Sequence, residues 1–207
     1  VGTYTVTYNV SDAAGNGATA VTRTVEVVES VLSGVFTDSA VEGLTYTTNT
    51  QSGVTDASGT FQYQAGESIA FSIGSFQLGE SATAAAEMTP LDLISGAVLP
   101  TTHNELLRLV NKTRQREPDA VAFTKLVNVL VFLQALDSDK DASNGITIAD
   151  GMGAIIDDVT IDITMTTDEF KSSTALIELM NAAVTAEVVS SGFIKSAGVA
   201  LIHFYEA

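Results

Sequence analysis

The feature that most constrains this fold is a long apolar run, Ala120–Leu136, that leads directly into an acidic loop. Its few polar side chains fall near one narrow stripe at roughly three- to four-residue spacing, the period of an α-helix. They are Thr124, Lys125, Asn128 and Gln134. A helix that is apolar on nearly all sides must be buried. Pro118 and Asp119 suit its first turn, so the run predicts a buried central helix.

Composition limits the classes of partner. The 207 residues are 45% hydrophobic, which is enough for a substantial core in one or two domains. The net charge is −16 and Arg23 is the one basic residue in the first hundred, so we expect no nucleic-acid partner and a cation as the natural small ligand. No apolar run reaches the roughly 20 residues of a membrane span, because Lys125 and Asn128 interrupt the central one. We therefore expect no transmembrane segment.

Residues 1–29 are predicted to form a β-hairpin. Tyr4, Val6 and Tyr8 alternate with threonines, and a second alternating run follows a Gly-rich turn. The segment GTYTVTYNVSDAAGNGATAVTRTVEVV resembles the last two strands of bacterial immunoglobulin-like surface domains. Two strands cannot bury a sandwich core, so the resemblance implies that further strands lie upstream, or that the hairpin packs elsewhere.

Residues 30–88 are predicted to be β-rich, with short strands separated by turns and a hairpin around Gly74 and Ser75. The run VEGLTYTTNTQSGVTDASGTFQYQAGESIAFSIGSFQLG resembles transthyretin-like repeats of outer-surface and lipoprotein-type proteins of marine proteobacteria. Asp56 is interpreted as a turn residue in an Asx turn closed by Gly59. We expect this part to be small, antiparallel and sandwich-like.

Residues 89–207 are predicted to be helical and to pack with residues 30–88 as one domain, which gives the α+β class. Helices are expected over 103–116, 120–136, 148–156, 168–183 and 196–205, with a short alternating, strand-like segment at 159–164. The sequences T-P-L-D-L and V-N-V-L-x-F-L-Q-A-L-D-S-D-x-D-x-S-N-G-I resemble the helical part of the same lipoprotein-like family. The resemblance implies a cellular compartment and an architecture, and it implies no activity.

The acidic loop carries the candidate metal ligands. Asp137, Asp139 and Asp141 have the alternate spacing with which calcium loops open, because the backbone curls around the ion. Ala142 and Ile148 stand where an EF-hand has its Gly and its bidentate Glu, so an EF-hand is not expected. The other candidate ligands are Ser143, Asn144, a carbonyl near Ile146, and Asp150. The alternative is a solvated loop without metal.

Catalytic signals are weak. His103 and His203 lack metal-ligand spacing, and His203 is interpreted as a packed helix residue. The acidic pairs Asp157–Asp158 and Asp168–Glu169 are interpreted as a turn and a helix start. There is no nucleophile elbow, phosphate-binding loop or dinucleotide fingerprint, and no cysteine. The basic cluster Arg108–Arg116 is interpreted as a helix face with local ion pairs, with a docking patch for a neighbouring copy as the alternative.

These observations favour a non-catalytic, calcium-stabilised structural or adhesion module of a bacterial surface protein. We expect it at the cell surface or outside the cell, with other surface modules or copies of itself as partners. One alternative is a filament subunit that donates strands from residues 1–28. Another is a calcium-dependent domain that binds a glycan or a peptide, which predicts exposed aromatic side chains beside residues 137–150.

Overall fold

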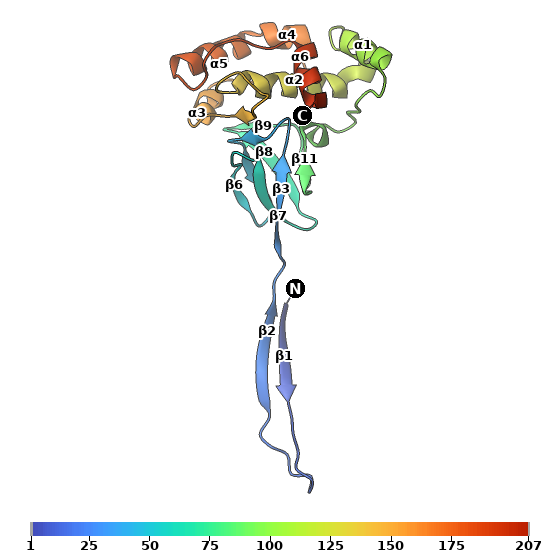
Figure 1. The fold of residues 1–207 in the computed structure, drawn as a ribbon, viewed down its shortest axis with the longest axis vertical. Helices are drawn as coiled ribbons and strands as arrows, with labels where there is room; N and C mark the ends of the chain where they lie inside the picture. Colours follow the sequence, from blue (N-terminus) through green and yellow to red (C-terminus); the bar gives the residue numbers. More distant parts are fainter. Residues whose placement is uncertain (1, 207) are drawn as a thin grey trace. The chain divides into compact units, whose positions relative to one another are not determined.

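The computed structural model describes residues 2–206 and divides the chain after residue 31 into two compact units. We call residues 2–31 the N-terminal unit and residues 32–206 the C-terminal unit. Helices and strands both contribute (Figure 1), so the predicted α+β class is confirmed. Each unit is described separately below.

The N-terminal unit is a two-stranded antiparallel hairpin. β1 (Gly2–Tyr8) pairs with β2 (Val21–Val27) in a register that sets Gly2 opposite Val27 and Tyr8 opposite Val21. The Asp12 carboxylate holds the turn by accepting bonds from the N–H groups of Ala14 and Asn16. Side chains alternate between an apolar face and a threonine face, and nearly all of them are exposed.

The β-part of the C-terminal unit consists of short strands in three sheets. One sheet has the order β10-β8-β5-β6, with β9 also paired to β8; a second has the order β11-β3-β7; a third joins β12 to β4. The pairings β11–β3 and β12–β4 are parallel, so the part is not purely antiparallel as expected. The bounds are β3 Val31–Phe36, β4 Val41–Glu42, β5 Thr45–Thr47, β6 Ser52–Val54, β7 Thr60–Gln64, β8 Ser68–Ile73, β9 Phe76–Gln77, β10 Ala82–Thr83, β11 Glu87–Met88 and β12 Ile146–Thr147.

Aromatic side chains fill the interior of these sheets. The rings of Phe36 and Phe71 lie 4.5 Å apart, and those of Phe61 and Phe71 lie 5.2 Å apart. Gly34 allows β3 to approach closely, because a Cβ there would lie 2.4 Å from the Phe61 ring and from the Ala85 carbonyl oxygen. The predicted hairpin around Gly74 and Ser75 is present as β8–β9.

The helices gather on one side of the β-part (Figure 1). Their bounds are η1 Pro90–Leu93, α1 His103–Lys112, η2 Pro118–Ala120, α2 Val121–Leu136, α3 Met152–Asp157, α4 Thr167–Ser172, α5 Thr174–Thr185 and α6 Ala197–Glu206. One continuous hydrophobic core includes residues of the sheets and of the helices. Thr102 caps α1 by accepting a bond from the Glu105 N–H.

α2 is the buried central helix that the apolar run predicts. Lys125 is partly exposed, whereas the other polar side chains of the helix are buried. Asn128 donates to the carbonyl oxygens of Ile163 and Met165, at 3.0 and 2.8 Å. Gln134 is also fully buried. Although Lys125 and Asn128 interrupt it, Pro118–Leu136 is long and apolar enough to cross a membrane by length and composition. Its 18-residue apolar window is 78% buried inside the protein, and the mostly buried core helix of a soluble protein meets the same criterion. The absence of a transmembrane segment stays a prediction.

Four boundary predictions are wrong. The helix expected over 103–116 ends at Lys112, and Arg116 beyond it has a left-handed backbone, with φ of 50°. The segment 159–164 forms no strand, because its carbonyl Ile163 O pairs with the Asn128 side chain and Asp162 makes a local turn with Thr164. The helix expected over 168–183 is two helices, α4 and α5, which meet at Ser173. The helix expected from Ile148 begins only at Met152.

Candidate functional site

The acidic loop follows α2 and is anchored at both ends. Leu136 ends the helix, and Ile146 begins β12, which pairs with β4. The Ile146 N–H donates to Ala40 O at 2.9 Å, and the Ile148 N–H donates to Glu42 O at 3.0 Å. The loop therefore joins the C-terminal end of the central helix to the sheets.

Asp139 and Asp141 shape the loop from within. Asp139 Oδ1 accepts from the Asp141 N–H at 2.8 Å, and Asp139 Oδ2 accepts from Asn144 Nδ2 at 2.9 Å. Asp141 Oδ1 accepts from Ser143 N and from Ser143 Oγ, at 3.2 and 2.6 Å. These bonds are successive Asx turns, the local chemistry by which short acidic side chains fold a loop. Hydrogen bonds from the Asn144 side chain and from the Asp141 backbone N–H lower the pKa of Asp139.

Asp137 differs because its carboxyl group is buried. The residue is 1% exposed, and its Oδ1 accepts from the Thr147 N–H at 3.0 Å. Its Oδ2 is buried without a hydrogen-bond partner. Burial raises the pKa of Asp137, the Thr147 N–H opposes that rise, and the charge of neighbouring Asp139 adds to it. A buried carboxylate oxygen without a partner carries a desolvation cost that a cation would offset.

Lys140 does not neutralise these carboxylates by direct contact. It has a left-handed backbone, with φ of 71°, and its Nζ donates to the Ala135 carbonyl oxygen at the end of α2. Burial lowers the pKa of Lys140 to about 8, and the charge of Asp137 opposes that change. The lysine therefore satisfies an open carbonyl group of the helix terminus.

The six predicted ligands do not form a ready-made cage. Asp137 and Asp139 are electrostatic neighbours, and Asp139 and Asp141 bond Asn144 and Ser143 respectively. Asp150 lines a separate pocket with Glu42, Gly43 and Thr147, among others. Across residues 2–206, no three acidic or histidine side chains are grouped as a metal site would group them. Calcium binding stays a prediction.

The basic cluster forms ion pairs within the C-terminal unit. Lys112 pairs with Asp119, Arg114 with Asp168 at 3.7 Å, and Arg116 with Glu169 at 2.8 Å. Bonds from Arg116 and then Thr166 lower the pKa of Glu169 to about 2. The two arginine pairs link the segment after α1 with α4, and the Lys112–Asp119 pair links α1 with η2. The acidic pair 168–169 is thus part of a helix start with a capping box.

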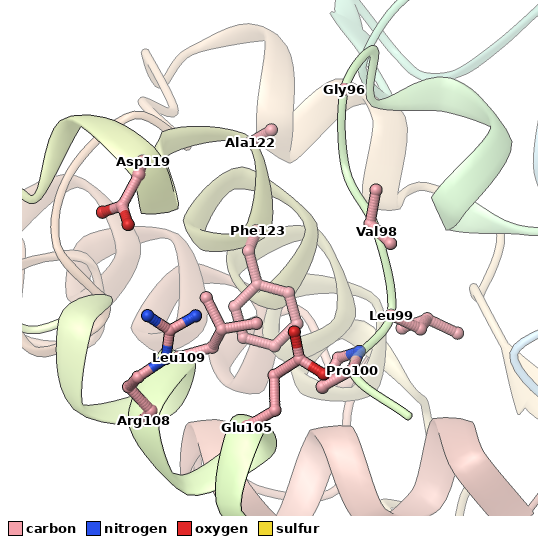
Figure 2. A pocket seen from close by; sticks show the side chains of 10 residues that line it. All are labelled: Gly96, Val98, Leu99, Pro100, Glu105, Arg108, Leu109, Asp119, Ala122 and Phe123. Atoms are coloured by element: carbon pink, nitrogen blue, oxygen red, sulfur yellow. The ribbon is translucent and has the colours of Figure 1, made fainter. Parts of the chain in front are cut away.

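A pocket with charged walls lies at the other end of α2. Figure 2 shows Arg108 and Glu105 of α1 beside Phe123, with Val98, Leu99 and Pro100 on the opposite wall. Its volume is about 230 Å³. Phe123 precedes Asp137 by most of the length of α2, so this pocket and the acidic loop are about 20 Å apart. The aromatic ring of Phe123 in this pocket therefore does not lie beside the acidic loop.

Sequence reasoning missed Asp38. This residue is 1% exposed, and its Oδ2 accepts from Gln134 Nε2 of α2 at 3.3 Å. His203 of α6 lies alongside, with Nε2 at 3.1 Å from Ser39 Oγ and 3.3 Å from the Asp38 carbonyl oxygen. The partners are 96 and more than 160 positions away in sequence. Asp38 follows a strand within a turn, and no local pattern distinguishes it.

The fold and the acidic loop together define an α+β protein with a candidate cation site at the end of its central helix. Comparison of the chain with protein-family models, with curated proteins and with solved structures finds no match.

Proposed function

We propose that the chain is a non-catalytic structural or adhesion module of a bacterial surface protein, stabilised by calcium at the acidic loop. The observation that carries this proposal is the Asp137 carboxyl group, which is buried with Oδ2 unpartnered beside Asp139. Calcium takes six to eight oxygen ligands. Rotation of Asp141, Ser143 and Asn144 would add oxygens to those of the two carboxylates.

Calcium at this loop would have a structural role. The loop connects the end of α2 to the parallel pair β12–β4, so an ion held there would fix the central helix to the sheets. A ligand that binds only the folded state stabilises it by mass action, by about 2.7 kcal/mol at a hundredfold excess over Kd. The net charge of −16 favours cation uptake. Surface modules and copies of the chain are the partners that we propose.

The test is thermal unfolding with excess calcium and with EDTA at equal ionic strength. We expect calcium to raise Tm in the wild type. Asp139→Asn removes one charge but keeps an oxygen for the Asp141 N–H, so it should fold and lose most of the calcium effect. Asp158→Asn removes the same charge from an exposed site outside the loop and is the matched control. Equal Tm values with calcium and with EDTA in the wild type would refute the site.

A second candidate function rests on the N-terminal hairpin. The apolar face of the hairpin is uncovered within the described chain: Tyr4 and Tyr8 are each 55% exposed and Val21 is 65% exposed. A two-stranded sheet also leaves both edges open to further strands. These features support a subunit that assembles by strand addition between copies.

Sedimentation of the chain tests assembly by the hairpin. We expect large, concentration-dependent species that disappear when Tyr4, Val6 and Tyr8 are all replaced by Thr, a residue that keeps strand propensity. Replacing Thr5 and Thr7 by Ser alters the opposite face and should leave assembly unchanged. A wild-type chain that stays monomeric at high concentration rules out this second candidate.

A further inference from the structure

A pocket of about 210 Å³ lies where the turn after β3 meets β11 and α6. Its lining consists of Thr37, Asp38, Glu87, Thr89 and Phe204. All of these residues belong to the C-terminal unit, and none belongs to the acidic loop. The pocket therefore shares no lining residue with the calcium site proposed above.

Asp38 lines this pocket and has a buried carboxyl group without a counter-ion. Its Oδ1 is buried and has no hydrogen-bond partner, whereas Oδ2 accepts the one bond from Gln134. His203 bonds the Ser39 hydroxyl and a carbonyl oxygen, so its imidazole does not pair with the carboxyl group. The positive charge of Lys195 affects the Asp38 carboxyl group electrostatically and without a hydrogen bond. No ion pair within residues 2–206 includes Asp38.

An unpaired buried carboxyl group favours a cationic ligand. Burial raises the pKa of Asp38 to about 7, while Gln134 and the charge of Lys195 oppose the rise. Removing a charged group from water without a partner costs free energy, and a positive ligand offsets that cost. Glu87, which is exposed at the pocket, adds a second negative charge.

The other walls favour an ammonium group over a bare metal ion. The Thr89 hydroxyl already donates to Asp92 Oδ2 at 2.9 Å, so its remaining capacity is that of an acceptor. An ammonium group has three N–H donors and accepts none. Phe204 offers an aromatic surface that suits the methylene stem and the positive charge of an alkylammonium and gives a metal no ligand.

We propose that this pocket binds a primary ammonium group on a short alkyl stem, with Asp38 and Glu87 as its counter-ions. Asp38 Oδ1 is buried behind the pocket wall, so a rotation of this side chain would bring it to the ammonium nitrogen. The Glu87 carboxylate and a threonine hydroxyl would complete the bonds to that nitrogen, while the stem lies against Phe204. Two sources share this chemistry: a free alkylamine, and a lysine side chain of another protein chain.

The test is an amide-resolved NMR titration at pH 8, where Asp38 is ionised. The probes are n-butylammonium chloride for the free amine and Nα-acetyl-lysine N-methylamide for a lysine side chain. We expect saturable shifts at residues 37–40 and at the Gln134 side-chain amide. Tighter binding of the blocked lysine assigns the pocket to a protein partner, and tighter binding of butylammonium assigns it to a free amine.

Variants and neutral probes make the outcome decisive. Glu87→Gln changes an exposed side chain and should weaken binding about tenfold, the value of one charge-assisted hydrogen bond. Asp38→Asn should abolish it, and Glu80→Gln is the matched exposed control that should not alter it. The proposal fails if 1-butanol shifts the same amides equally, if calcium or sodium saturates them instead, or if Glu87→Gln binds as the wild type does.

Discussion

At the scale of single residues, Asp38 links the stability of this protein to pH. The folded-state pKa of its carboxyl group is about 7 against an ordinary value of 3.8, chiefly because of burial. The folded protein therefore holds this proton more tightly than the unfolded chain does. The contribution to stability is complete below about pH 4, declines as pH rises towards 7, and is lost above it.

Asp38→Asn should remove this dependence. Asn keeps an oxygen for Gln134 and carries no charge at any pH. At about 1.4 kcal/mol for each pH unit, the difference between 3.8 and about 7 amounts to about 4 kcal/mol. Relative to the wild type, the variant should gain about 3 kcal/mol in unfolding free energy between pH 5 and pH 8. Urea denaturation at both pH values measures the gain.

The control for this comparison is Asp158→Asn, at an exposed position. Its difference from the wild type measures the effect of the same chemical change away from Asp38. If the difference between Asp38→Asn and the wild type is the same at both pH values, then Asp38 does not titrate with a raised pKa in the folded protein.

At the scale of elements, the sequence predicts α2 well because its signal is local. A run that is apolar on nearly every side requires burial whatever its neighbours are. Segment 159–164 misleads because alternation alone does not supply a partner strand. Its Ile163 carbonyl oxygen bonds Asn128, which is 35 residues distant. Likewise, Ser173 stops one helix and caps the next by accepting from the Leu176 N–H, a competition that periodicity does not reveal.

Substitution of Phe132 measures how much the packing of α2 contributes to the stability of the C-terminal unit. Its side chain is fully buried, with its ring 5.0 Å from Phe76 of β9 and 6.4 Å from Phe170 of α4. Phe132→Ala should destabilise the C-terminal unit by about 3–5 kcal/mol, because it removes buried apolar surface and leaves a cavity. Chemical denaturation gives the value.

Val121→Ala, at the 46% exposed start of the same helix, is the control and should change stability by less than about 1 kcal/mol. Similar losses for the two variants would mean that α2 is not the centre of the packing.

At the scale of the whole molecule, the acidic loop could be predicted and the Asp38 pocket could not. The spacing of Asp137, Asp139 and Asp141 is visible within five residues of sequence. The Asp38 pocket is assembled from the turn after β3, β11 and α6, and Gln134 is 96 positions from Asp38. Only the long-range packing of the C-terminal unit brings these groups together.

The charge of the whole molecule predicts a response to salt. With 25 acidic and nine basic residues, self-repulsion opposes the compact state. The ion pairs Arg114–Asp168 and Arg116–Glu169 are largely exposed and contribute little to the free energy of unfolding. Screening these attractive pairs with salt should therefore cause little loss of stability. Raising sodium chloride from about 0.05 to 0.5 M shortens the screening length and should raise Tm, by about 3 °C for each kcal/mol gained.

Differential scanning calorimetry in EDTA measures this response without any calcium contribution. A matched series in sodium sulfate at equal ionic strength distinguishes screening from salt-specific effects. A Tm that falls with sodium chloride would show that attractive pairs outweigh repulsion.

The register of the N-terminal hairpin has a mechanical consequence. Gly2 pairs with Val27, so the two ends of the ribbon lie side by side at its open end. Tension applied between these two ends would break the strand pairing one residue pair at a time, beginning with Gly2 and Val27, instead of loading all the pairs at once. Fully opened, the segment from Gly2 to Val27 would extend by roughly 80–90 Å, at about 3.3–3.6 Å per residue. Under a force transmitted through both units, the hairpin would therefore open and extend at a lower force than the one that unfolds the packed C-terminal unit, and it would re-form when the force is released.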